Sequence, residues 1–190
     1  PFIERSFCLE KVENQNNFYD CGVAFGNFQK MLADFPVETL HETIVNFHNT
    51  PSRFQDFQKA VKEGDKDRAA LAGSEIAFAL DREYDTAVLT GLLAEVKLPL
   101  RVTHNYTKLN NILFDDDTKK ALCILDLDTI MPGLSLYDFG DSIRFGASTG
   151  AEDETDLDKV ELDLTLFEIF TKGYLKGCAG SLTETEIRML

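Results

Sequence analysis

Four polar side chains near the middle of the sequence have the types and the spacing needed for chemistry on a phosphate group. His104, Lys108 and Asn111 lie within one short stretch, and Asp126 follows after two apolar runs. A lysine can offset the charge of a phosphate, while amide and carboxylate oxygens are ligands that Mg²⁺ accepts. Phosphoryl transfer from ATP requires these groups together with a residue that orients the attacking hydroxyl. The stretch is therefore a candidate catalytic loop, with Asn111 and Asp126 as candidate donors to one metal ion.

The apolar runs around this stretch predict the elements that hold it. Residues 111–114 have the pattern of a strand, and residues 115–118, Asp-Asp-Asp-Thr, have the composition of a turn. The second apolar run, residues 121–125, completes a predicted hairpin. We expect the catalytic loop and the hairpin to occupy about residues 99–130, so that the candidate metal donors meet at one end of the hairpin.

Helical patterns occupy most of the remaining sequence. Apolar residues recur at three- and four-residue steps, which is the period of an amphipathic helix. Pro51 and Asp65 stand where two of these helices begin. The predicted helices cover residues 17–35, 51–63, 66–84, 86–95, 136–145 and 160–176. Four apolar side chains of the third helix are expected to point inward: Leu71, Ile76, Phe78 and Leu80. The fold class predicted is mainly α with one small β-hairpin.

Residues 103–111 resemble the catalytic loop of the aminoglycoside phosphotransferase and choline kinase superfamily. They read T-H-N-Y-T-K-L-N-N, where the family has the pattern H-x-D-x-x-x-x-N. Residues 124–147 and 47–54 are similar to bacterial N-acetylhexosamine 1-kinases, and they read I-L-D-L-D-T-I-M-P-G-L-S-L-Y-D-F-G-D-S-I-R-F-G-A and F-H-N-T-P-S-R-F. The resemblance, which covers most of the chain, implies the C-terminal lobe of a protein-kinase-like fold. It also implies transfer of the ATP γ-phosphate to a small hydroxylated substrate, the anomeric hydroxyl of an N-acetylhexosamine.

The resemblance assigns a role to each residue of the loop that matches the family pattern. Asn111 and Asp126 would bind Mg²⁺, and Asp128 is a further candidate ligand. Lys108 would reach the transferring phosphate, and His104 would brace the loop through its ring. The cofactors implied are therefore Mg²⁺ and ATP.

Other charged side chains outside the loop are weaker candidates. His48 and Arg53 belong to the shared stretch 47–54, which makes them candidates for the sugar side of the cleft, with core or capping roles left open. Arg144 is expected to pair either with Asp141 or with the acidic loop, residues 151–158.

The base position departs from the family pattern, because Tyr106 stands where the family has Asp. A carboxylate is ionised at neutral pH and accepts the hydrogen bond of a hydroxyl, whereas a phenol is mostly protonated and offers a donor. Tyrosine is also larger and would intrude on the acceptor. Loss of a positioned base lowers a rate by about 10²–10⁴, so we expect at best weak turnover. A non-catalytic pseudokinase lobe that binds a sugar or a protein partner is the alternative.

The nucleotide-binding lobe of the family is not expected within these 190 residues. Residues 1–16, ahead of the first helix, are too few for a five-stranded sheet, and Gly22 and Gly26 lie in a helical pattern where they indicate close packing. The chain has no initial Met and ends in a segment whose Thr183 and Glu186 form a capping box. We therefore expect a single C-terminal lobe taken from a longer protein, with a candidate dimer surface on the face that the nucleotide lobe would cover.

Two aspartate motifs suggest other functions. Asp138-Phe139-Gly140 has the letters of a protein-kinase metal motif, but Asp126 already occupies the place after the hairpin. Asp138 is therefore interpreted as a helix cap or as an anchor for the catalytic loop. Asp126 and Asp128, with the later Gly140-Asp141-Ser142, also resemble a haloacid dehalogenase-type phosphatase, which uses an aspartate nucleophile beside Mg²⁺. That fold needs alternating strands and helices, so it is the remote alternative.

Composition and charge limit the partners. The chain is 44% hydrophobic with 15 Phe residues, which is typical of a packed globular protein. A net charge of −14 argues against a nucleic acid partner, because duplex binding needs clustered Lys and Arg. No apolar run reaches the roughly 20 residues of a membrane span, so we expect no membrane partner. The 4 Cys residues are scattered without metal-like spacing, which indicates free thiols in the cytoplasm.

Overall fold

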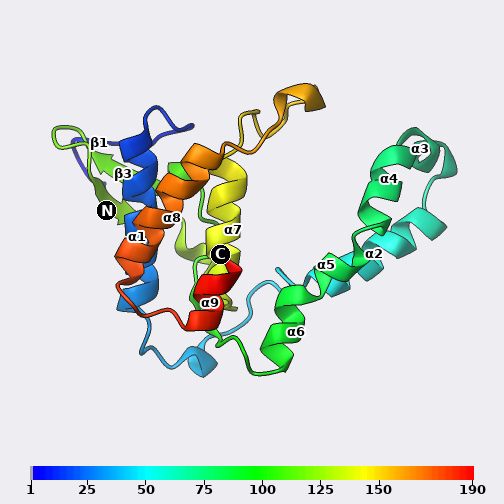
Figure 1. The fold of residues 1–190 in the computed structure, drawn as a ribbon, viewed down its shortest axis with the longest axis horizontal. Coiled ribbons are helices and arrows are strands. Elements are labelled where there is room, and N and C mark those ends of the chain that lie inside the picture. Colours follow the sequence, from blue (N-terminus) through cyan, green and yellow to red (C-terminus); the bar gives the residue numbers. More distant parts are fainter. Residues whose placement is uncertain (1) are drawn as a thin grey trace. The chain divides into compact units, whose positions relative to one another are not determined.

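The computed structural model describes residues 2–190, which divide into two compact units. The larger unit comprises the described residues up to Thr43 together with Leu100–Leu190, and the smaller unit is Ile44–Pro99. Figure 1 shows the helices and strands of both units. The candidate catalytic loop and its hairpin lie wholly in the larger unit.

Two long helices, α1 (Gln15–Met31) and α8 (Leu164–Cys178), form the framework of the larger unit and lie side by side (Figure 1). Glycines on both helices allow the close approach. A Cβ atom on Gly22 would lie 2.5 Å from a backbone oxygen of α8, and one on Gly177 would lie 2.3 Å from a backbone oxygen of α1. Gly26 has an equally close backbone neighbour in α8. The prediction that Gly22 and Gly26 serve close packing is confirmed.

Two small antiparallel sheets complete the larger unit. The first has the strand order β1 (Ser6–Phe7), β3 (Ile112–Asp115), β4 (Ala121–Ile124), and the second pairs β2 (Arg101–Thr103) with β5 (Met131–Gly133). Strands β3 and β4 form the predicted hairpin, which is therefore confirmed. Short 3₁₀ turns flank it: η2 (Leu109–Asn111) and η3 (Leu127–Thr129).

The remaining helices of the larger unit are α7 (Ser135–Gly146) and α9 (Glu184–Met189), with 3₁₀ turns at η1 (Val37–Thr39) and η4 (Leu157–Lys159). The predicted capping box is present at the start of α9, since Thr183 and Glu186 exchange side chain to backbone hydrogen bonds. The helix-rich architecture with small sheets agrees with the predicted fold class.

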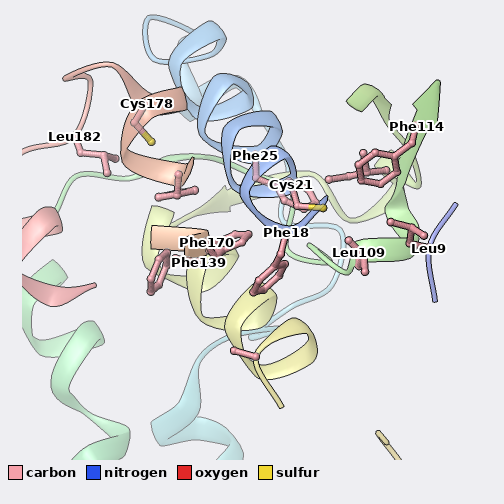
Figure 2. Packing of buried hydrophobic residues seen from close by; sticks show 13 residues of the cluster. Leu9, Phe18, Cys21, Phe25, Leu109, Phe114, Phe139, Phe170, Cys178 and Leu182 are labelled. Atoms are coloured by element: carbon pink, nitrogen blue, oxygen red, sulfur yellow. The ribbon is translucent and has the colours of Figure 1, made fainter. Parts of the chain in front are cut away.

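Aromatic side chains from α1, α7 and α8 meet in the core of the larger unit (Figure 2). The ring of Phe170 lies 4.8 Å from that of Phe18 and 5.7 Å from that of Phe139, measured between centroids. Phe139 belongs to α7, so this packing fixes α7 against the two long helices. The position of α7 matters for the site, because its polar side chains reach the catalytic loop.

The smaller unit consists of five helices: α2 (Thr50–Glu63), α3 (Lys66–Leu71), α4 (Gly73–Leu80), α5 (Glu83–Thr86) and α6 (Val88–Ala94). As predicted, Pro51 lies in the first turn of α2, and the Asp65 side chain caps α3. The single helix predicted over 66–84 is wrong, because the chain breaks into three short helices there.

The prediction of an inward apolar face on that segment is also wrong. Leu71 is 88% exposed, Phe78 60% and Leu80 41%, and Ile76 is only half-buried. Helical spacing aligns apolar side chains on one face, but it does not supply a layer to cover that face. Within residues 44–99 the breaks between α3, α4 and α5 prevent one continuous face from forming.

Two further properties of residues 2–190 concern the apolarity of the helices and the state of the cysteines. None of their helices combines the length and the apolarity that a bilayer crossing requires. Cys21 and Cys178 are buried free thiols of the core, whereas the free thiols of Cys8 and Cys123 are more accessible.

Candidate active site

Asp138 of α7 holds the start of the catalytic loop. Its Oδ2 accepts a hydrogen bond from the backbone N–H of His104 at 3.0 Å, and its Oδ1 accepts one from the backbone N–H of Asn105 at 2.7 Å. Gln29 of α1 donates its Nε2 to Oδ2 at 2.8 Å. Burial raises the pKa of Asp138 to about 7, although these three donors act to lower it. Of the two roles expected for Asp138, the loop anchor is observed, whereas the helix cap is not, since Leu134 precedes α7.

The next turn of α7 holds Thr107. Asp141 Oδ2 accepts the backbone N–H of Thr107 at 2.8 Å, and Ser142 Oγ donates to the carbonyl oxygen of Thr107 at 2.9 Å. The hydroxyl of Thr107 donates in turn to the carbonyl oxygen of Asp138 at 2.5 Å. Asp141 and Ser142, which belong to the sequence that resembles a phosphatase motif, therefore hold the catalytic loop in place.

His104 braces the loop against the end of the hairpin. Its Nε2 lies 2.7 Å from the carbonyl oxygen of Leu125, and its Nδ1 accepts the backbone N–H of Tyr106 at 3.3 Å. An Nδ1 that accepts carries no proton, so the ring is neutral and Nε2 is the donor. Burial lowers the pKa of His104, which favours this neutral form. The rings of Phe25 and Phe28 each pack edge-on at 5.9 Å.

Asn111 and Asp126 flank the same backbone segment. The N–H of Leu125 donates to the carbonyl oxygen of Asn111 at 2.8 Å, and Asp126 follows directly with a left-handed backbone, φ 58°. Because His104 binds the carbonyl oxygen of Leu125, both polar groups of this one peptide segment are held by the catalytic loop. The structure thus brings His104, Asn111 and Asp126 together around Leu125.

Asn111 and Asp126 carry side-chain oxygens of the kind that a magnesium ion accepts. Asn111 donates its Nδ2 to the carbonyl oxygen of Tyr106 at 2.7 Å, which leaves its Oδ1 available to a cation. The side chain of Asp126 is exposed, as is that of Asp128 in η3. No three His, Cys, Asp or Glu side chains within residues 2–190 cluster into a metal site by themselves. Mg²⁺ is often held by one or two protein oxygens together with waters and substrate phosphates.

Tyr106 and Lys108 lie close together on the open side of the loop. Tyr106 is 36% exposed, and the Nζ of Lys108 lies 5.1 Å from the centroid of its ring. Lys108 Nζ also donates to Glu152 Oε2 at 2.8 Å. This bond to Glu152 raises the pKa of Lys108 above its ordinary value. The lysine of the loop is therefore charged and already bound to an anion of the chain.

A pocket of about 990 Å³ lies on the same side of the larger unit, and Lys108, Asn110, Arg144 and Glu152 contribute to its wall. Arg144 binds Asp141 Oδ1 at 3.0 Å and Glu152 Oε1 at 3.0 Å. Arg144 therefore pairs both with Asp141 and with the acidic loop, residues 151–158, through Glu152. The segment 8–13, which follows β1, also lines this pocket.

His48 and Arg53 belong to the smaller unit, whereas the catalytic loop belongs to the larger one. The ring of His48 lies 4.6 Å from the ring of Phe47, and Arg53 Nη2 donates to the carbonyl oxygen of Phe47 at 3.4 Å. Both contacts are made within the smaller unit, and Arg53 is exposed there. Their place on the sugar side stays a prediction.

Two supporting residues, Asn105 and Gln29, were not predicted. Asn105 adopts a left-handed backbone, φ 64°, and donates its Nδ2 to the carbonyl oxygen of Thr129 at 2.8 Å. The residue type could have indicated this conformation, because Asn is enriched among non-glycine residues with positive φ. Gln29 continues the apolar series of Phe18, Cys21 and Phe25 in α1, and it is fully buried. A polar residue at a core position calls for a buried partner, here Asp138.

Comparison with known proteins finds a family model and a solved structure that match this chain. The model of the family described as "Phosphotransferase enzyme family" (APH) matches residues 37–168, which include the catalytic loop, the hairpin and α7. A solved structure, aminoglycoside-3'-phosphotransferase of type VIII, matches 95% of this chain with 15% sequence identity and a TM-score of 0.48. The chain spans 61% of the length of that structure.

Proposed function

Since the chain belongs to the phosphotransferase enzyme family, we propose that it forms the C-terminal, substrate-side lobe of an ATP- and Mg²⁺-dependent kinase. The acceptor we propose is a small hydroxylated molecule, specifically the anomeric hydroxyl of an N-acetylhexosamine. The proposal rests chiefly on one observation: the hydrogen bonds of Leu125 join the loop of His104 and Asn111 to Asp126. We place the nucleotide-binding lobe outside these residues.

Each loop residue has a task in this proposal that its contacts permit. Asn111 Oδ1 and the carboxylate of Asp126 would hold Mg²⁺, with Asp128 as a further candidate, and the bound ion would offset charge on the ATP phosphates. Lys108 would pair with the transferring phosphoryl group. His104, neutral and buried, keeps the loop in register with the hairpin.

Tyr106 at the base position makes this chain a poor catalyst in the proposal. A phenol hydroxyl donates a hydrogen bond, whereas the hydroxyl of the substrate needs a group that accepts one. Two residues of the loop hold the backbone at this position, because the Tyr106 N–H donates to His104 Nδ1 and the Tyr106 carbonyl oxygen accepts from Asn111 Nδ2. Only the side chain at this position departs from the family pattern.

The substitution Tyr106→Asp in the intact protein tests the proposal. We expect ATP-dependent phosphorylation of N-acetylglucosamine or N-acetylgalactosamine to rise by about 10²–10⁴, which is the usual contribution of a positioned base. Tyr106→Asn is the matched control, since it removes the bulk of the ring without adding a base. A rate for the Asp variant no higher than that of the Asn variant would contradict the proposal.

A second candidate function is a non-catalytic sugar-binding lobe. It is favoured by the partly open ring of Tyr106, which offers an aromatic surface beside the pocket wall at Lys108. Calorimetry with each N-acetylhexosamine, with and without Mg-ATP, distinguishes the two functions. Sugar binding without nucleotide binding would support the binding lobe, whereas binding of both ligands would support the kinase.

A further inference from the structure

Two cations at the edge of the 990 Å³ pocket share one carboxylate of the chain. Lys108 Nζ donates to Glu152 Oε2 at 2.8 Å, and Arg144 Nη1 donates to Glu152 Oε1 at 3.0 Å. Each oxygen of Glu152 thus has its own cationic partner. Lys108 comes from the catalytic loop and Arg144 from the last turn of α7, so the two cations reach this point from separate elements.

The two cations are anchored by other residues of the site, although the side chain of Arg144 is 53% exposed and that of Glu152 is 49% exposed. The side chain of Lys108 is only 13% exposed and packs 5.2 Å from the ring centroid of Phe145. Arg144 is tied to Asp141, whose other oxygen holds the catalytic loop at Thr107. Glu152 lies in the irregular connection between α7 and α8, and half of its side chain faces solvent. The carboxylate is therefore the component that can leave without unfolding the site.

A planar carboxylate held by Lys and Arg through its two oxygens occupies the kind of site that a phosphate group takes. The pKa of Glu152 is lowered by its hydrogen bonds from Lys108 and then Arg144, so the pair of cations does favour an anion here. The remaining pocket wall includes the acidic residues Glu10, Glu13 and Glu154 and one further cation, Lys11, so the paired cations Lys108 and Arg144 make this corner the most favourable place for an anionic group.

We propose that Lys108 and Arg144 form a phosphate-binding subsite, and that Glu152 fills it as an internal counter-anion until a ligand phosphate displaces it. The subsite shares Lys108 with the proposed kinase function, and it rests on that function only for the identity of the ligand. The chemical class is a phosphate dianion, carried either by the phosphorylated sugar or by the nucleotide.

The test is a titration of the chain with inorganic phosphate, followed by calorimetry or by NMR shifts of the Arg144 and Lys108 region. Glu152→Gln should tighten phosphate binding by about three- to tenfold, which is the range for removing exposed ion pairs. Glu154→Gln is the matched control, since it makes the same charge change in the same pocket at a residue whose carboxylate accepts a hydrogen bond from the backbone N–H of Asp156 rather than from a cation. Arg144→Gln added to Glu152→Gln should abolish the gain.

Equal binding by the Glu152→Gln and Glu154→Gln variants would overturn the subsite, because net charge alone would then explain the change. Since neither nucleotide nor sugar is needed, this outcome is independent of the kinase proposal. Two further arms identify the source of the phosphate: N-acetylglucosamine 1-phosphate and Mg-ATP. If Glu152→Gln binds inorganic phosphate more tightly than wild type but binds neither of these two ligands more tightly, the result would support the subsite and contradict the proposed substrates.

Discussion

Asp138 shows how one buried side chain can set the geometry of a loop far away in the sequence. It receives hydrogen bonds from two consecutive backbone N–H groups of the loop and from Gln29. Backbone donors that are buried need partners, because an unpaired one costs about 1–3 kcal/mol. The carboxylate therefore orients the two residues that precede Tyr106.

The substitution Asp138→Asn tests this anchoring role. The amide keeps one acceptor oxygen but turns an NH₂ group toward a backbone N–H donor, so we expect a loss of about 1–3 kcal/mol in the free energy of unfolding. Urea unfolding of both proteins measures it. Asp128→Asn, at an exposed aspartate of η3, serves as the control and should change stability by less than about 0.5 kcal/mol.

The raised pKa of Asp138 also predicts a pH dependence. A group whose pKa is higher in the folded than in the unfolded protein takes up a proton on folding, so its stabilising contribution is present at low pH and is lost as pH rises toward about 7. The difference in unfolding free energy between wild type and Asp138→Asn should therefore shrink between about pH 4 and pH 7. A difference that grows over this interval would mean that the three donors outweigh burial.

At the scale of elements, the contact between α1 and α8 depends on glycines. Gly22 and Gly26 of α1 face backbone atoms of α8, and Gly173 and Gly177 of α8 face backbone atoms of α1. With no Cβ on either side, the two helices approach more closely than side chains would allow. This approach places Phe18 and Phe170 in contact, and so provides the surface on which α7 packs.

Replacement of a single one of these glycines should separate the helices. For Gly177→Ala we expect a destabilisation of about 1–3 kcal/mol or more, since its Cβ would lie 2.3 Å from the carbonyl oxygen of Val23. Gly140→Ala is the control, because Gly140 lies in α7 with no neighbour within 4 Å of an added Cβ. That variant should be stabilised by up to about 1 kcal/mol through helix propensity. Chemical denaturation of both variants measures the contrast, and equal effects would contradict the packing role.

At the scale of the whole molecule, Glu186 joins three distant parts of the larger unit. Arg101 of β2 donates Nε and Nη2 to its two carboxylate oxygens at 2.5 and 2.7 Å, and Ser135 of α7 donates its hydroxyl at 2.6 Å. Glu186 is almost completely buried in α9. Burial would raise its pKa, but the hydrogen bonds from Arg101, Ser135 and Thr183 leave that pKa lowered. The last helix is thereby fastened to the strand that leads into the catalytic loop.

The substitution Glu186→Gln should destabilise the chain by about 3–5 kcal/mol, because it leaves the partly buried guanidinium of Arg101 without its counter-charge. The pKa of Glu186 is lower in the folded protein than in the unfolded one. Its contribution to the free energy of unfolding is therefore present at a pH above the unfolded pKa, and it is lost as pH falls through the folded pKa. Acid titration of stability should thus be flatter below pH 5 in the variant. Glu184→Gln, at the exposed start of α9, is the control and should leave the acid titration unchanged.

Periodicity identified most of the helices and the hairpin, because both depend on contacts close in sequence. The same method failed for residues 66–84, where the apolar spacing was helical but Leu71 and Phe78 remain exposed. A hydrophobic face predicts burial only where another element covers it. The sequence pattern contains no information on that second surface.

By itself, the sequence determined the local elements and the order of polar residues in the catalytic loop, His104 to Asn111 and then Asp126 after the hairpin. It did so because turns, helix caps and strand pairing between neighbours depend on nearby residues. The tertiary structure alone decided which distant groups contact that loop. Asp138, which accepts a hydrogen bond from Gln29, binds the loop backbone, and Glu152 forms an ion pair with Lys108. These contacts depend on how α1, α7 and α8 pack, and so they follow from the shape of the core rather than from any short stretch of chain.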